Sequence, residues 1–118
     1  MRFGGANKSF ALGRLKTGEM NRLEKSYAEH LDLLLHKGDV VWWKFEAVKL
    51  RLADNTFLSP DFFVMLPSGE LEAHETKGFM TEDANVKLKV AAAMFPFRFY
   101  LIRAVSKKAG GGFSIVEV

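Results

Sequence analysis

The chain has 118 residues, of which 48% are hydrophobic and 13% aromatic, so we expect one globular domain with its own core rather than a disordered segment. It contains no cysteine, which excludes disulfides, thiolate nucleophiles and cysteine-ligated zinc, and its three histidines lack the spacing of a zinc site. The net charge is +3, and no apolar run is long enough to cross a membrane or to form a signal-peptide core. These features predict a soluble, cytoplasmic protein.

The start of the chain differs in composition from the rest. Residues 1–18 contain four glycines and four basic residues but no acidic residue. Such a segment is too polar to pack by itself. We interpret residues 1–16 as a flexible basic arm that contacts a phosphate backbone, with a frayed terminus as the alternative, and we expect one folded domain over residues 17–118. The basic residues of the arm are Arg2, Lys8, Arg14 and Lys16.

A first helix is predicted from Thr17 to His36, with Gly38 as its stop. Its apolar residues recur at helical spacing, and Glu24 falls within that apolar stripe. Alternating patterns then predict three strands, at 40–53, 56–66 and 71–77. The first of these changes phase near residue 47, which predicts a bulge.

A second helix is predicted from Thr81, as its cap, to Phe95, followed by a strand over 97–105 and an edge strand over 113–118. This helix is apolar on two sides. The second apolar side indicates either a homodimer or burial against the protein's own sheet, and the sequence leaves the two open. The order is α-β-β-β-α-β, an α/β fold with a central mixed sheet flanked by helices.

Three ionisable residues lie in strands that otherwise favour burial. Glu75 and Lys77 are two apart in the third strand and share a face, whereas His74 points the other way and is interpreted as a surface residue. Pairing with the neighbouring strand brings Asp61 close to Glu75. Two converging carboxylates repel unless they share a proton or a cation, and Mg²⁺ suits carboxylate oxygens. Lys77 would then orient a water molecule and stabilise charge on a phosphoryl group. A surface ion pair beside an ordinary Pro-Asp turn is the alternative.

In the order Pro60-Asp61 and then Glu75-Thr76-Lys77, the chain resembles the PD-(D/E)XK nucleases. It is most similar to phage junction-resolving endonucleases of the endonuclease I kind, and to short phage-encoded proteins that carry the same motif. The resemblance covers residues 17–105 and includes Leu23-Glu24 on the leading helix. It implies a restriction-endonuclease-like core, with host cytoplasm as the location of a phage-encoded protein.

The resemblance also implies a role for individual residues. Asp61, Glu75 and the Thr76 carbonyl would bind Mg²⁺, for which Mn²⁺ can substitute, and Lys77 would be the catalytic lysine. Glu24 would be the helix-borne acid that supports a second metal ion, with Glu19 as the alternative. Lys87 of the second helix would contact DNA, with a solvated lysine as the favoured alternative.

We therefore expect a Mg²⁺-dependent endodeoxyribonuclease that acts on branched DNA. A single-strand or end-directed DNA nuclease is the first alternative. A catalytically inactive DNA-binding accessory protein that keeps the nuclease fold is the alternative from another class. The expected partners are DNA, no membrane, and a second copy of the chain if the protein is a homodimer.

Overall fold

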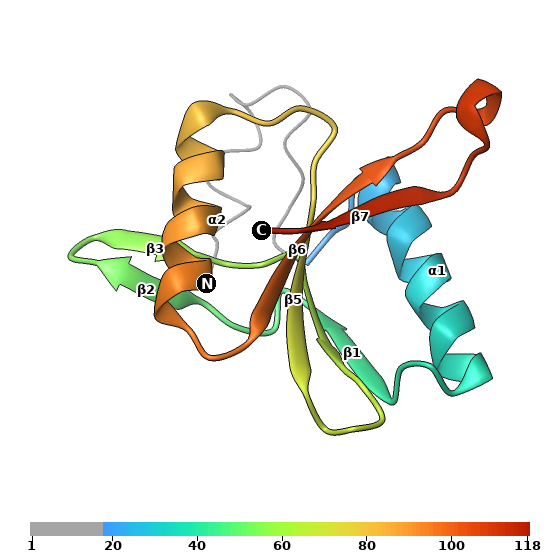
Figure 1. Cartoon of the computed structure of the whole chain (residues 1–118), viewed down its shortest axis with the longest axis horizontal. Coiled ribbons are helices and arrows are strands. Elements are labelled where there is room, and N and C mark those ends of the chain that lie inside the picture. The colour runs from blue at the N-terminus through green and yellow to red at the C-terminus, as the bar shows by residue number, and fades with distance from the viewer. Residues whose placement is uncertain (1–17) are drawn as a thin grey trace.

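The computed structural model describes residues 18–118, in which two helices and seven strands follow one another along the chain (Figure 1). The arm residues Arg2, Lys8, Arg14 and Lys16 lie outside the described part. The elements are α1 (Arg22–Lys37), β1 (Trp42–Phe45), β2 (Leu50–Ala53), β3 (Thr56–Leu58), β4 (Phe62–Met65), β5 (Leu71–Thr76), α2 (Glu82–Met94), β6 (Arg98–Ala104), the 3₁₀ turn η1 (Lys107–Ala109) and β7 (Phe113–Glu117).

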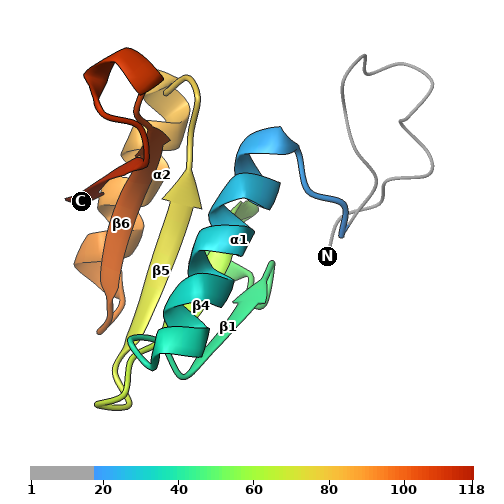
Figure 2. The same cartoon turned by 90° about the vertical axis from the view of Figure 1, so that its right-hand side faces the viewer.

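Five of these strands form one mixed sheet in the order β1-β4-β5-β6-β7. Only β5 and β6 are parallel, because α2 connects them as a crossover, and the other neighbours are antiparallel. The two helices cover opposite faces of the sheet, as the two views show (Figures 1 and 2). The described residues therefore form the expected α/β domain with a central mixed sheet between helices.

Helix α1 begins at a capping box rather than at the predicted Thr17. The side chain of Asn21 accepts a hydrogen bond from the Glu24 N–H at 2.8 Å, and the Asn21 N–H donates to Glu24 Oε1 at 2.8 Å. Two of the unpaired donors at the helix start are thus satisfied reciprocally. The helix ends as expected at Gly38, whose φ of 87° is the left-handed conformation that glycine adopts at low cost.

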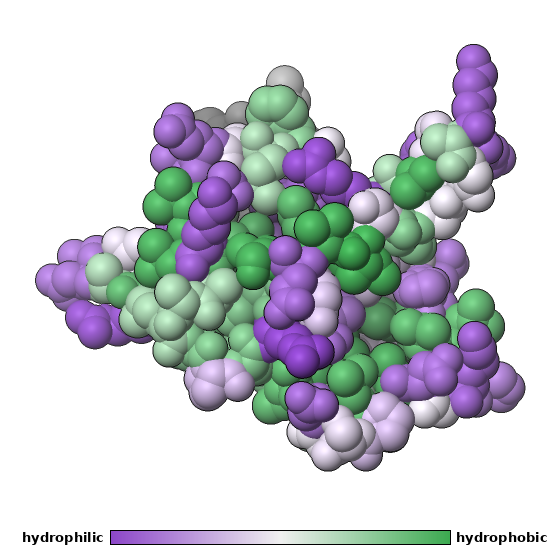
Figure 3. All heavy atoms as spheres, viewed as in Figure 1, coloured by the Kyte–Doolittle hydropathy of each residue, from purple (hydrophilic) through white to green (hydrophobic). Residues whose placement is uncertain are grey.

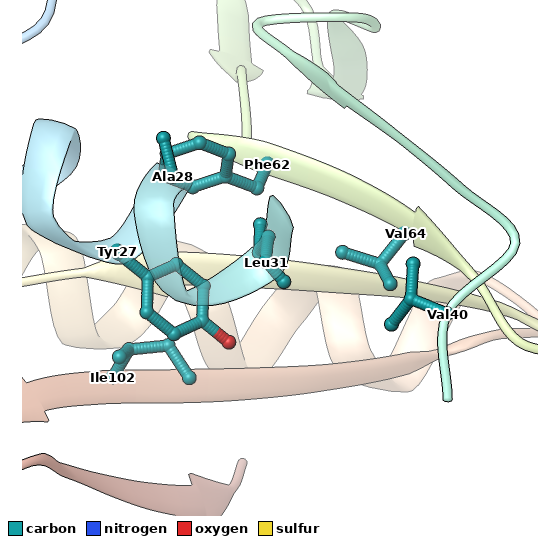
Figure 4. Close-up of a cluster of buried hydrophobic side chains, with 7 residues drawn as sticks. All are labelled: Tyr27, Ala28, Leu31, Val40, Phe62, Val64 and Ile102. Atoms are coloured by element: carbon teal, nitrogen blue, oxygen red, sulfur yellow. The ribbon is translucent and has the colours of Figure 1, made fainter. Parts of the chain in front are cut away.

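The face of the sheet under α1 is packed with aromatic and branched side chains. Tyr27 and Leu31 of α1 point toward Phe62 and Val64 of β4 and toward Ile102 of β6 (Figure 4). All five are buried. The rings of Tyr27 and Phe62 meet edge to face with centroids 5.4 Å apart, a favourable geometry for an aromatic pair.

The predicted bulge near residue 47 is wrong, because the change of phase marks the end of one strand and the start of another sheet. β1 belongs to the five-stranded sheet, whereas β2 pairs only with β3 in a two-stranded ribbon. The end of β1 is followed by Glu46, whose positive φ of 51° interrupts the extended conformation. The predicted strand over 56–66 is likewise divided into β3 and β4 around Pro60-Asp61. The ribbon packs beside α2 over the opposite face of the sheet.

Helix α2 begins after Thr81, whose side chain accepts from the Ala84 N–H at 3.2 Å, and it packs on the sheet through the buried Leu88 and Ala91. Its second apolar stripe, which includes Val86, Val90 and Met94, is exposed. The protein's own sheet therefore does not cover this stripe, and the homodimer stays a prediction. Neither helix of the described part has the length and hydrophobicity required to span a bilayer.

The interpretation of His74 as a surface residue is wrong. His74 and Glu72 are buried beneath α1, where His74 Nε2 lies 2.9 Å from Glu72 Oε1 and His74 Nδ1 lies 2.6 Å from the Tyr27 hydroxyl. The carboxylate oxygen accepts from Nε2, so the Tyr27 hydroxyl can donate to Nδ1. Burial, with the Glu72 charge as a second cause, raises the pKa of Tyr27 well above its usual range, which keeps the hydroxyl protonated.

The substitution Tyr27→Phe should lower the free energy of unfolding by about 1–3 kcal/mol, because it leaves a buried imidazole nitrogen without its partner. Urea denaturation of the full chain measures this change. Tyr100→Phe is the matched control, since Tyr100 is only half-buried and water can replace its hydroxyl. An equal loss in both variants would contradict a special role for the Tyr27–His74 contact.

Candidate functional site

The predicted site residues meet where β4 begins and β5 ends. β4 and β5 are antiparallel, and Phe62 is paired with His74. The register continues by one position, which sets Asp61 opposite Glu75. The prediction that strand pairing brings these two acids together is therefore confirmed.

Asp61 and Glu75 are held by each other's strand. The Asp61 N–H donates to Glu75 Oε1 at 2.9 Å. In return, the backbone N–H and the hydroxyl of Thr76 each donate to Asp61 Oδ2 at 2.9 Å. Each carboxylate is thus held through one of its own two oxygens, in a geometry that the strand register imposes.

Lys77 extends from the same face of β5 as Glu75. Its Nζ lies 3.4 Å from Glu75 Oε2, and the lysine side chain is 30% exposed whereas that of Glu75 is 8% exposed. The ammonium therefore lies between the buried carboxylate and solvent. Asp61 is half-buried, so this carboxylate also reaches solvent.

The environment of Glu75 disfavours its charged form. Burial is the main cause and the neighbouring Asp61 charge is the second, and together they raise the pKa of Glu75 to about 8 although Lys77 acts in the opposite direction. A carboxylate pair under this repulsion is relieved by a proton or by a bound cation. Strongly shifted pKa values of this kind occur preferentially at functional sites.

The backbone of Thr76 adds an oxygen to the same place. The N–H and C=O of a residue in an extended strand point to the same side of that strand. Since the Thr76 N–H donates to Asp61, the Thr76 carbonyl also points toward the side on which Asp61 lies. The pairing of β4 with β5 ends at Phe62 and His74, so no β4 residue occupies this position.

Glu46 is a residue near the site that the sequence reasoning missed. Its backbone N–H donates to the Asp61 carbonyl at 2.8 Å, and its carboxylate accepts from the Gly18 N–H at 3.3 Å. A positive φ in a glutamate is uncommon and is retained only where surrounding contacts enforce it. Glu46 thus positions Asp61 through the backbone. The change of phase in the hydrophobic alternation near residue 47 was the feature of the sequence that could have pointed to Glu46.

The remaining predicted site residues are carried by or lie next to the two helices. Glu24 is half-buried and caps α1 through its reciprocal hydrogen bonds with Asn21. Glu19 is exposed just before the helix. Lys87 is half-buried on α2.

The donor atoms at the site fit a small divalent cation. Asp61, Glu75 and the Thr76 carbonyl would supply hard oxygen ligands to such an ion, and Mg²⁺ commonly completes a set of this kind with water and phosphate oxygens. Over residues 18–118, no group of three or more histidine, aspartate or glutamate side chains is placed to hold a metal ion. A cation here would therefore rely on two side chains together with the backbone.

Comparison of the chain with protein-family models, with curated proteins and with solved structures found no match. The resemblance to PD-(D/E)XK nucleases therefore stays a hypothesis that depends on the motif residues. The geometry of Asp61, Glu75, Thr76 and Lys77 is the basis on which a function can be proposed.

The substitution Glu75→Gln should make the free energy of unfolding less dependent on pH. Because the pKa of Glu75 is higher in the folded state than in the unfolded chain, the folded protein binds this proton more tightly. The associated stability is present at acidic pH and is lost as the pH rises from about 4.5 to about 8. In chelator, wild type and variant should be equally stable in acid, and the variant should be the more stable at alkaline pH.

Denaturation at several pH values measures this effect, with Glu70→Gln as the control because Glu70 is exposed in the turn before β5. A wild-type stability that does not fall between these pH limits relative to Glu75→Gln would show that Glu75 is already ionised in the folded protein.

Proposed function

We propose that the protein is a divalent-metal-dependent endonuclease that hydrolyses DNA phosphodiester bonds, and that its core is of the restriction-endonuclease-like kind. The observation that carries this proposal is the fixed Asp61–Glu75 carboxylate pair with Lys77 at its solvent side. In the PD-(D/E)XK nucleases that the motif resembles, two acids hold the metal ion and a lysine assists the hydrolysis. The order of elements supports the fold assignment, with the β2–β3 ribbon as an addition between the first two core strands.

Each site residue has a defined task in this reaction. A bound Mg²⁺ would supply the positive charge that activates a water molecule and neutralises the phosphate. Asp61, Glu75 and the Thr76 carbonyl would hold that ion. Lys77 donates hydrogen bonds to the attacking water or to the non-bridging phosphate oxygens, where negative charge increases in the transition state. Thr76 keeps the Asp61 carboxylate in one orientation by two hydrogen bonds.

Cleavage of a labelled four-way junction, linear duplex, single strand and supercoiled plasmid tests the proposal. We expect cutting with Mg²⁺ or Mn²⁺ and none with chelator. Asp61→Asn, Glu75→Gln and Lys77→Ala should each reduce the rate by at least about 100-fold, because each removes charge stabilisation that acts in the transition state. Glu70→Gln should cut like wild type.

The substrate that is cut fastest discriminates among the candidate functions. Preference for the junction supports a branched-DNA endonuclease, and preference for the single strand or for free ends supports the first alternative. Binding without cutting by the wild-type protein in every metal would identify the inactive DNA-binding protein instead. Cutting that survives Glu75→Gln would contradict the assigned site.

The substitution Glu24→Gln separates a role in capping from a role in catalysis. Glutamine retains the reciprocal hydrogen bond of a capping box but carries no charge, so the free energy of unfolding should change by less than about 0.5 kcal/mol. If Glu24 supports a second metal ion, the cleavage rate should nevertheless fall, and it should fall most at limiting Mg²⁺. An unchanged rate would contradict a role of Glu24 in supporting a second metal ion.

A further inference from the structure

The parallel pairing of β5 and β6 places a second cation beside the catalytic lysine. Thr76 is paired with Ile102, and the Lys77 N–H continues the ladder by donating to the Ile102 carbonyl at 3.0 Å. The next residue of β6, Arg103, therefore lies next to Lys77. Side chains two apart share a face, so Arg103 projects from the same face as Leu101, the partner of Glu75.

Arg103 is exposed and forms no ion pair with any residue in the described part of the chain. Arg98, at the opposite end of the same strand, is also exposed but lies 4.0 Å from Glu117. A guanidinium without a carboxylate partner in the described part of the chain, next to the proposed cleavage site, is available for a phosphate group. Its planar fork of donors suits two phosphate oxygens at once.

Beyond Arg103 the chain continues into a hairpin whose charged residues are all basic. Residues 99–116 contain Arg103, Lys107 and Lys108 but no aspartate or glutamate. The hairpin extends past the sheet beside the start of α1 (Figure 1), and hydrophilic side chains project from its tip (Figure 3). A groove of about 590 Å³ separates it from α1, and its lining includes Lys107 and Arg22.

We propose that the β6–β7 hairpin, residues 103–112, binds the phosphate backbone of the DNA next to the cleavage site, with Arg103 at the phosphate nearest to Lys77 and with Lys107 and Lys108 at phosphates further along the strand. This inference rests on the proposed nuclease function, since it takes the Asp61–Glu75 site as the place of the scissile bond. The ligand that fits is a polyanion with regularly spaced charges. Arg103, Lys107 and Lys108 follow one another along the hairpin, away from the Asp61–Glu75 site.

The conformation of the hairpin favours close approach of such a ligand. Gly110, Gly111 and Gly112 all have positive φ, and none has an atom within 4 Å of the place that a Cβ would occupy. The backbone here is therefore uncovered, and the lysines of η1 stand next to it. Contacts of this kind carry no sequence information, so the hairpin is expected to bind DNA of any sequence.

The test is DNA binding by the full chain, measured by fluorescence anisotropy of a labelled duplex in chelator over a series of salt concentrations. Each phosphate contact that is lost should reduce the slope of log K against log salt by about 0.9. We therefore expect a reduction of about 1 for Arg103→Gln and of about 2 for the double variant Lys107→Gln/Lys108→Gln, with several-fold weaker binding at low salt. Arg98→Gln is the control and should behave like wild type.

Binding and salt slope that are unchanged in both hairpin variants would overturn the inference, as would an equal effect of Arg98→Gln. A wild-type protein that binds no duplex would overturn it as well. Failure of the nuclease proposal has a different signature. In that case the wild-type protein cuts nothing in Mg²⁺, while the hairpin variants still lose binding and salt dependence in chelator.

Discussion

Glu72 and Glu75 are buried carboxylates on β5, a central strand of the sheet, and they point to opposite faces. A buried charge without a partner costs several kcal/mol, so each must be compensated where it lies. On one face α1 supplies Tyr27, which completes a chain of contacts through His74 to Glu72. On the other face β4 supplies the Asp61 backbone N–H, and Lys77 lies beside the second oxygen of Glu75. The position of α1 and the register of β4 both meet this requirement.

The arrangements around Glu72 and around Glu75 differ in how completely the carboxylate is compensated. Under α1 the polar chain is closed, since tyrosine, imidazole and carboxylate satisfy one another away from solvent. At Glu75 the compensation is incomplete, because Asp61 brings a second negative charge against the first and, among residues 18–118, Lys77 alone forms an ion pair with Glu75. The first arrangement stabilises the helix on the sheet. The Asp61–Glu75 pair still lacks compensating positive charge, at a place that solvent and ligands can reach.

The sequence was sufficient for the two helices, for the strands from β5 onward and for the pairing of Asp61 with Glu75, because these follow from periodicity and from the short turn between β4 and β5. It joined β1 with β2 and β3 with β4, because alternation alone does not show where the chain leaves one sheet for another. It could not place His74, since a histidine that shares a strand face with Glu72 and Thr76 is typical of a solvent-exposed face. Only the tertiary position of Tyr27 shows that this face is covered. The conformation of Glu46 was equally inaccessible, because a positive φ in a residue other than glycine is enforced by contacts distant in the sequence. Arg103 acquired its significance from the parallel pairing with β5, which the composition of the strand does not reveal.

The β2–β3 ribbon has a consequence for the motions of the site. It forms no ladder with the five-stranded sheet and is held through side chains such as Leu58, which packs in the same core as Leu88 of α2. Segments with few backbone links to the rest of a domain open locally at a lower free energy than the global transition. Only Ser59 and Pro60 separate the ribbon from Asp61. Opening of the ribbon would therefore loosen one half of the carboxylate pair while Glu75 stays fixed in the sheet, and amide hydrogen exchange would be faster in the ribbon than in β5.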